Sequence, residues 1–181
     1  MLNRTKHTLI GLLTASMTLV VAFIVTGGPI LPDKAPIPDE VQSLANLSEL
    51  KLEVIIPSAM LIHLESFSVS REMIRGEMEN LLEENGVDVV EEGDVPTCTV
   101  VVTTNTSSDL PRAMGVTFHL SIEQVVFVKR IEKSLSAPTY ALVHGILVTH
   151  DDVSREMRKT VPMLIQQLMR RMSQANLHAE K

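Results

Sequence analysis

VTFHLSIEQVVFVK, residues 116–129, is the stretch of sequence that decides the fold. Apolar and polar side chains alternate strictly over residues 118–123. This alternation is typical of a β-strand that buries one of its two faces. The alternation is lost from Gln124 to Val128, where both faces turn apolar, and we expect either a β-bulge or a segment covered on both faces there.

Other strands are predicted on both sides of this stretch. Each combines alternation or a short apolar run with flanking turn residues. They span residues 50–56, 87–90, 97–104 and 139–149. Short connections around Asn105–Asp109 and Pro138 join the later strands, and short connections favour antiparallel pairing.

Two amphipathic helices are predicted. Ser70 is placed as the N-cap of the first, and Gly86 stands where a left-handed C-cap belongs. The last helix opens at Asp151 or Asp152, with an apolar stripe of nearly five turns. That stripe consists of Val153, Met157, Val161, Leu164, Leu168 and Met172. Pro162 predicts a kink or a break into two helices, while Met60–Phe67 is ambiguous between strand and turn.

The predicted fold class is α+β. The body should form a two-layer sandwich, in which a mostly antiparallel sheet carries the two amphipathic helices on its apolar face. One N-terminal transmembrane helix is expected to precede this sandwich. The sequence shows no internal repeat.

The transmembrane prediction rests on Thr8–Thr26, nineteen residues without a charge. A helix of that length spans about 28 Å, close to the hydrocarbon thickness of a bilayer. Arg4 and Lys6 precede it, so the positive-inside bias keeps the N-terminus in the cytoplasm. We therefore expect a single-pass protein of the cytoplasmic (inner) membrane, with its body on the periplasmic or extracellular side.

A cleaved signal peptide is the alternative for the same segment. Val25-Thr26-Gly27 offers small residues for cleavage, but the apolar stretch is longer than the usual signal core. Lipoprotein processing is excluded because no cysteine lies near its end. The expected organisation is a cytoplasmic N-terminus (1–7), an anchor or signal peptide (8–26), a proline-rich spacer (27–40) and an extracytoplasmic α/β domain (41–181).

Composition excludes several classes of function. The net charge of −6 and the scarcity of aromatic residues argue against binding to nucleic acid, which needs a basic face or stacking rings. Cys98 is the single cysteine, so neither an intramolecular disulfide nor a cysteine-built metal site can form. Cys98 lies in a strand-like run, and we expect it to be buried.

The body resembles a loosely defined group of uncharacterised bacterial exported or membrane-anchored small α/β proteins, over most of residues 44–176. The resemblance is carried by Leu47-Ser48-Glu49-Leu50, Glu79 to Gly86-Val87, the run from Ser121 to Arg130, and Ala175-Asn176. Pro162 and the lack of aromatic residues in the last helix depart from the pattern. The group has no activity to transfer, so the resemblance implies only the fold and export.

Motifs that carry catalysis are missing from the sequence. It contains no GxGxxG, P-loop, HExxH, GxSxG or CxxC. Among the six histidines, His119 and His144 lie on adjacent predicted strands and could face each other. Further candidates are His63 near Glu65, and His150 beside Asp151 and Asp152. No spacing forces three ligands together, so we expect no metal and no cofactor.

Charged residues form two groups. An acidic run lies between Glu77 and Asp94, while the last helix carries Arg155, Arg158, Lys159, Arg170 and Arg171. The run lacks the spacing of a calcium loop and is interpreted as a solvated face. The two groups could complement each other inside the fold, or one of them could face a partner.

These observations predict a non-enzymatic binding or scaffolding domain of the cell envelope, of which an accessory subunit of a membrane protein complex is one form. The expected partners are the membrane and another protein or a second copy of the chain. The candidate contact residues are Met163, Met169, Arg170 and Arg171. The alternative is a small-ligand-binding or transporter-auxiliary domain. An exposed apolar patch or a self-pairing sheet edge would favour the first interpretation, and a convergent polar pocket the second.

Overall fold

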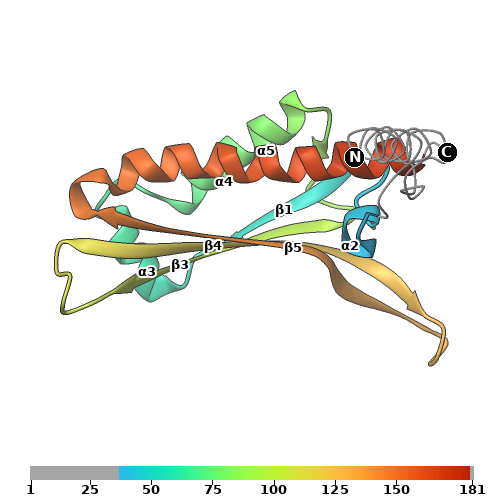
Figure 1. Cartoon of the computed structure of the whole chain (residues 1–181), viewed down its shortest axis with the longest axis horizontal. Helices are drawn as coiled ribbons and strands as arrows, with labels where there is room; N and C mark the ends of the chain where they lie inside the picture. Colours follow the sequence, from blue (N-terminus) through green and yellow to red (C-terminus); the bar gives the residue numbers. More distant parts are fainter. Residues whose placement is uncertain (1–36, 180–181) are drawn as a thin grey trace, which may run out of the picture. The chain divides into compact units, whose positions relative to one another are not determined.

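The computed structural model describes residues 37–179, and Figure 1 shows them built around one five-stranded sheet. The strands lie in the order β2-β1-β3-β4-β5. Their bounds are β1 Glu49–Ile55, β2 Asp88–Val89, β3 Thr97–Thr106, β4 Ala113–Val128 and β5 Lys133–Thr149. All five correspond to strands predicted from the sequence, and β4 contains the stretch of alternating residues.

The sheet is mixed, so the prediction of a mostly antiparallel sheet is wrong at two of its four interfaces. β1 pairs in parallel with both β2 and β3, whereas β3–β4 and β4–β5 are antiparallel. The parallel pairs arise because helices separate β1 from β2, and a crossover through a helix returns the chain in the same direction. Only the last three strands are joined directly by short turns.

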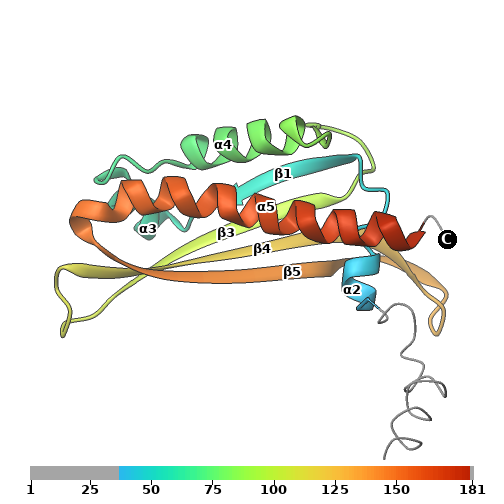
Figure 2. The ribbon, with the colours of Figure 1, turned by 45° about the horizontal axis from the view of Figure 1, so that its top comes forward.

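Helices α4 (Arg71–Glu84) and α5 (Val153–Ala179) cover one face of the sheet, as predicted (Figures 1 and 2). The Ser70 hydroxyl accepts a hydrogen bond from the Met73 backbone N–H at 3.1 Å, which confirms the N-cap. Gly86 has a φ of 79°, a left-handed conformation that suits glycine at a helix end. α5 runs without a break through Pro162.

Three short helical segments were not predicted. They are α2 (Asp39–Gln42), α3 (Ser58–Glu65) and the 3₁₀ turn η1 (His150–Asp152). α3 accounts for most of the Met60–Phe67 stretch that was ambiguous between strand and turn. It has no clear apolar stripe, since Leu64 is buried while Ile62 beside it is 73% exposed. Without that stripe, periodicity gives no helical signal.

The core lies between the sheet and its two long helices. β4 contributes Phe118, Leu120 and Ile122, which are all completely buried. Leu164 of α5 packs into the same core, and Cys98 of β3 is completely buried, as expected. Burial raises the pKa of the Cys98 thiol to about 12.

The face of the sheet away from α4 and α5 carries several exposed side chains, although Thr99 and Ser121 on that face are buried. Strand register places Ile55, Val101, His119 and Val143 in one row across four strands of this face. Val143 and Leu147 of β5 are 62% and 69% exposed.

The register between β4 and β5 shifts at Ile122 and Glu123, which pair with Tyr140 and Pro138, so the bulge adds the residue Thr139 to β5 and not, as expected, a residue to β4. Beyond it, residues 124–128 pair only with β5, so they form a two-stranded ribbon with it. The alternative of a segment covered on both faces is wrong, because Val125 and Phe127 are exposed.

Within residues 37–179, no helix has both the length and the apolar character needed to cross a bilayer. The predicted anchor, residues 8–26, and residues 27–36 of the predicted spacer lie outside the described part of the chain. The prediction of a transmembrane helix therefore stays a prediction.

Candidate partner-binding site

Among the described residues, β5 is an edge strand with one side that pairs with no other strand. It is 17 residues long and pairs only with β4. Within residues 37–179, one hydrogen bond reaches the backbone of β5 from outside the sheet. The hydroxyl of Ser43, the residue after α2, donates it to the Thr139 carbonyl at 3.3 Å. An edge strand whose outward N–H and C=O groups lack partners is a template for pairing with another extended chain.

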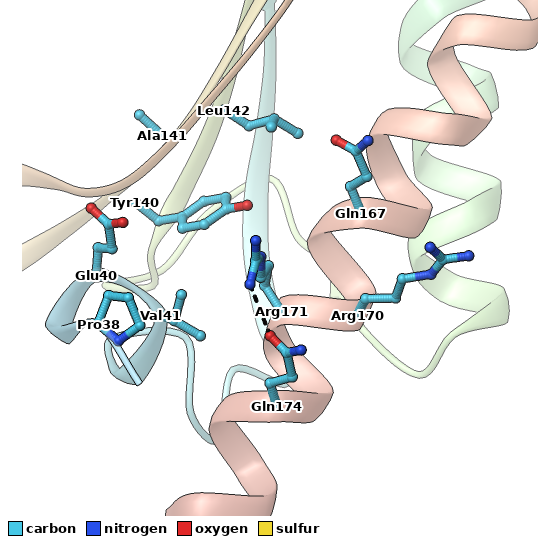
Figure 3. A pocket seen from close by; sticks show the side chains of 10 residues that line it. All are labelled: Pro38, Glu40, Val41, Tyr140, Ala141, Leu142, Gln167, Arg170, Arg171 and Gln174. Atoms are coloured by element: carbon cyan, nitrogen blue, oxygen red, sulfur yellow. Dashed lines mark hydrogen bonds between the residues drawn. The ribbon is translucent and has the colours of Figure 1, made fainter. Parts of the chain in front are cut away.

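A cavity of about 500 Å³ lies beside this edge, between α2, β5 and α5 (Figure 3). β5 contributes Tyr140, Ala141 and Leu142. The other lining residues are Pro38, Glu40 and Val41 near α2, with Gln167, Arg170, Arg171 and Gln174 on α5. Their polar groups are mainly hydrogen-bond donors, and such a set suits an acceptor such as a carboxylate.

The two arginines of the cavity are placed differently. In Figure 3 the Arg171 side chain points toward Tyr140, whereas Arg170 extends from α5 away from that ring. Arg171 Nη1 donates a hydrogen bond to Gln174 Oε1 at 3.1 Å, and both arginines are exposed. Arg171 is therefore the cation directed into the cavity, with Arg170 at its rim.

Tyr140 is the residue of the cavity whose pKa is shifted by its surroundings. Partial burial raises the pKa of the Tyr140 phenol, the positive charge of Arg171 opposes this rise, and the carboxylate of Glu40 adds to it. The phenol is thus held protonated, as a hydrogen-bond donor. Tyr140 and Arg171 together present donors from two different elements.

The two methionines predicted as contact residues lie elsewhere. Met163 and Met169 are half-buried on α5, and Met169 packs against the hydrophobic core. Met169 also lines a separate hollow with Met172 and Asn176. The structure therefore groups Arg170 and Arg171 at one cavity and does not bring the two methionines to it.

The predicted complementarity between the acidic run and the basic residues of α5 does not involve Arg170 or Arg171. Among the described residues, the ion pairs of α5 join Arg155 and Lys159 to acids of their own segment, Asp152 and Glu156. Burial raises the pKa of the Glu77 carboxyl, and the charge of Arg158 opposes that rise. Among the described residues, the acidic run and the basic residues of α5 form no ion pair with each other, and the attraction between Glu77 and Arg158 acts at longer range.

The histidines predicted to face each other do not. His119 pairs with Val143 and His144 pairs with Phe118, so the two rings lie on opposite faces of the sheet. His63 and His150 instead flank Phe67, with ring centroids 5.2 and 5.3 Å from the phenyl ring. Within residues 37–179, no three His, Cys, Asp or Glu side chains gather as metal ligands.

Sequence reasoning missed Tyr140, Gln167 and the free edge of β5. In the sequence the tyrosine looks like one more inward residue of a strand, and the glutamine like a surface residue of a helix. Tyr140 and Gln167 lie at the same cavity because β5 is the edge strand beside α5. Local periodicity does not reveal strand order, so the sequence did not predict this. The single usable signal was the pair of adjacent arginines on the last helix.

No protein-family model matches the chain, and no curated protein matches it. Solved structures give weak similarities. A minor lipoprotein from Acinetobacter baumannii is 18% identical, with 70% of this chain and 91% of that one covered and a TM-score of 0.40. The rare lipoprotein B from Shewanella oneidensis is 15% identical, with 74% and 99% covered and a TM-score of 0.36.

A neuraminyllactose-binding hemagglutinin homolog from Helicobacter pylori is 11% identical, with 85% of this chain and 96% of that one covered and a TM-score of 0.36. Two of these three proteins are bacterial lipoproteins. Similarity at this level carries no argument about function, which has to come from the geometry of the chain itself.

Proposed function

We propose that this protein is a non-enzymatic binding module of the cell envelope, which takes up an extended segment of another protein along the free edge of β5. In this proposal residues 8–26 anchor the chain in the cytoplasmic (inner) membrane, and residues 41–181 lie on the far side. The observation that carries the proposal is the edge of β5 around Tyr140–Leu147, which pairs with no other strand within residues 37–179, with a donor-lined cavity beside it.

Strand addition would supply affinity and side-chain pockets would supply selectivity. An incoming strand forms backbone hydrogen bonds with the edge, and its side chains point alternately to the two faces of the sheet. On the outer face they would meet Val143 and Leu147, which favour apolar neighbours. On the helical face they would meet Arg171, which favours a carboxylate. The proposed partner is therefore an extended segment that alternates apolar and acidic residues.

The size of the cavity favours a second candidate, the small-ligand-binding domain. Its volume of about 500 Å³ falls inside the range of ligand sites, roughly 300–1,000 Å³. Such sites are mostly apolar, however, whereas this one is lined by arginine, glutamine and glutamate side chains on an open strand edge. Strand addition accounts for the edge as well as for the cavity.

A displayed library of nine-residue peptides, panned on the full chain in mild detergent, tests the proposal. We expect the recovered peptides to alternate apolar and acidic residues. The double variant R170E/R171E should lose them, because it replaces attraction by repulsion. R112E is the matched control, since Arg112 is exposed in the loop before β4 and lines none of the cavity.

A second pair of substitutions tests the edge itself. V143K/L147K places two lysines on β5, a device that blocks strand addition at natural sheet edges. We expect it to abolish peptide binding with no change in melting temperature, because both positions are exposed. Peptides without acidic residues, or binding that survives both double variants, would overturn the proposal. If the protein binds small metabolites but no peptide, and R171E weakens that binding, the small-ligand-binding function would be favoured instead.

The proposed location has its own test. A cysteine introduced at Gln42, which is exposed, should react with a membrane-impermeant thiol reagent in intact cells or spheroplasts. A cysteine introduced at Ser16, inside the predicted anchor, should not. Buried Cys98 should give little background. Reaction at position 42 only after the cytoplasmic membrane is broken would contradict the orientation.

A further inference from the structure

The ribbon at the end of β4 and β5, residues 124–137, projects beyond the other strands (Figures 1 and 2). Past the bulge at Ile122/Glu123, β4 has β5 as its one partner strand. A two-stranded ribbon with no third strand or helix on it is marginally stable in water. A surface that covers the ribbon would stabilise it and would explain its exposed apolar residues.

Both faces of this ribbon carry exposed apolar side chains. Val125 and Phe127 are 63% and 62% exposed on one face. Leu135 is opposite Val126 on the other face, and Ile131 lies in the turn. Exposed apolar residues grouped in this way mark an interaction surface.

The turn of the ribbon is basic, in contrast to the rest of the chain. Lys129, Arg130 and Lys133 surround a single acid, Glu132, in a chain whose net charge is −6. None of these four residues forms an ion pair within residues 37–179. Basic side chains around an apolar ribbon are the pattern of segments that lie in an anionic membrane surface.

The ribbon also lies at the end of the domain where the described chain begins. Gln124 Nε2, at its root, donates a hydrogen bond to the Ser43 carbonyl at 2.9 Å, one residue after α2. Only residues 27–36 separate the predicted anchor, residues 8–26, from Ile37. An anchor so close in sequence would keep this end of the domain near the bilayer.

From these observations we infer that the ribbon 124–137 docks on an anionic lipid surface, with its apolar side chains among the headgroups and its basic turn against lipid phosphates. The inference shares the predicted anchor with the proposed function but not the β5 edge beside the cavity. Docking would fix the domain at a defined orientation, with the loop Ser107–Arg112 at the far end of the sheet pointing away from the membrane (Figure 1).

Site-specific fluorescence on the full chain tests this inference. The protein is reconstituted into nanodiscs of phosphatidylcholine, with or without phosphatidylglycerol and with a spin-labelled quencher lipid. A cysteine at Ser134, in the ribbon, carries an environment-sensitive dye, and the matched control carries it at Ser108, in the far loop. Both sites are exposed, and Cys98 is buried and should stay unlabelled.

We expect the dye at Ser134 to shift to the blue and to be quenched in anionic nanodiscs, while the dye at Ser108 changes little. K129E/R130E/K133E and, separately, V125S/F127S should reduce the quenching at Ser134 to the level of Ser108. Their melting temperatures should match the parent, because all five positions are exposed.

Equal quenching at both sites, equal quenching without phosphatidylglycerol, or no quenching at Ser134 would overturn the inference. A blue shift at Ser134 that depends on protein concentration and not on lipid would also overturn it, and would identify a second copy as the occupant. Failure of the chain to enter nanodiscs at all would instead count against the anchor. Loss of peptide binding at β5 would leave this result unchanged, so the two proposals can fail separately.

Discussion

Placing an ionisable group at Leu164 should turn the packing of α5 against the sheet into a pH-dependent quantity. Leu164 is 1% exposed and belongs to the core cluster between α5 and the strands. Truncating a buried leucine costs about 2–5 kcal/mol. Leu164→Asp adds the cost of burying a carboxyl group. This cost is smaller when the group is protonated, so a buried site favours the neutral form. The folded-state pKa of the introduced carboxyl should then lie above its unfolded value of about 3.9.

The sign of the pH effect follows from this raised pKa. Below about pH 3.9 the carboxyl is neutral in both states, so Leu164→Asp should be about as stable as Leu164→Asn. Above that pH the unfolded state loses its proton first, and stability should fall by about 1.4 kcal/mol per pH unit until the folded-state pKa is reached. Because a domain is stable by only about 5–15 kcal/mol, this fall, added to the lost leucine packing, should unfold the variant by neutral pH.

Urea unfolding of a chain of residues 37–181, followed by circular dichroism from pH 4 to 8, would measure this. The parent should unfold cooperatively, with mixed helix and strand signals. Leu164→Asn corrects for the pH dependence of all other groups, and the difference between the two variants isolates the new carboxyl. A constant difference across the pH range, or a Leu164→Asp variant as stable as the parent, would refute the packing of α5 described above.

Three smaller predictions can be checked on the same chain. Gly86→Ala should destabilise the domain by about 1 kcal/mol, because the φ of 79° is strained for alanine. Gly76→Ala should stabilise it by about 0.5–1 kcal/mol, because Gly76 lies inside α4 with open space around its Cβ. Two shifts of the same sign in melting temperature would contradict this pair of predictions. Ser70→Ala should cost about 1 kcal/mol through loss of the N-cap, and Ser70→Asp should retain most of the stability. Cys98 should resist a small thiol reagent up to about pH 9 in the folded state and react once urea unfolds the chain, since burial raises its pKa to about 12; prompt reaction without urea would show that β3 is not buried.

The sequence was most informative where a local pattern has one physical meaning. Alternation over residues 118–123 required a half-buried strand, and β4 buries that apolar set. Ser70 and Gly86 marked the ends of α4 because capping depends on hydrogen bonds and backbone angles within a few residues. The loss of alternation from Gln124 to Val128 indicated an irregularity in this region, although the extra residue of the bulge, Thr139, lies on β5.

Relations between distant segments were beyond the same reasoning. A shift of one residue in register moves every side chain of a strand to the other face, and this places His119 and His144 on opposite sides of the sheet. The strand β5 begins at Lys133, before its predicted start at 139, because pairing with β4 holds a serine-rich segment extended. The candidate site depends on such relations, since Tyr140 and Arg171 meet only when β5 is the edge strand beside α5.

The place of α5 after all five strands has a consequence for when the domain can fold. The strands β3, β4 and β5 are consecutive and can pair locally, but the apolar face they form is covered by a helix that follows all of them, Val153–Ala179. Until that segment arrives, Phe118 and its neighbours on the sheet lack their cover. A nascent chain that exposes an apolar sheet face is prone to aggregation and cannot lock into its native state. The domain can therefore complete its core only once Val153–Ala179 has been synthesised, whatever the order in which the strands pair.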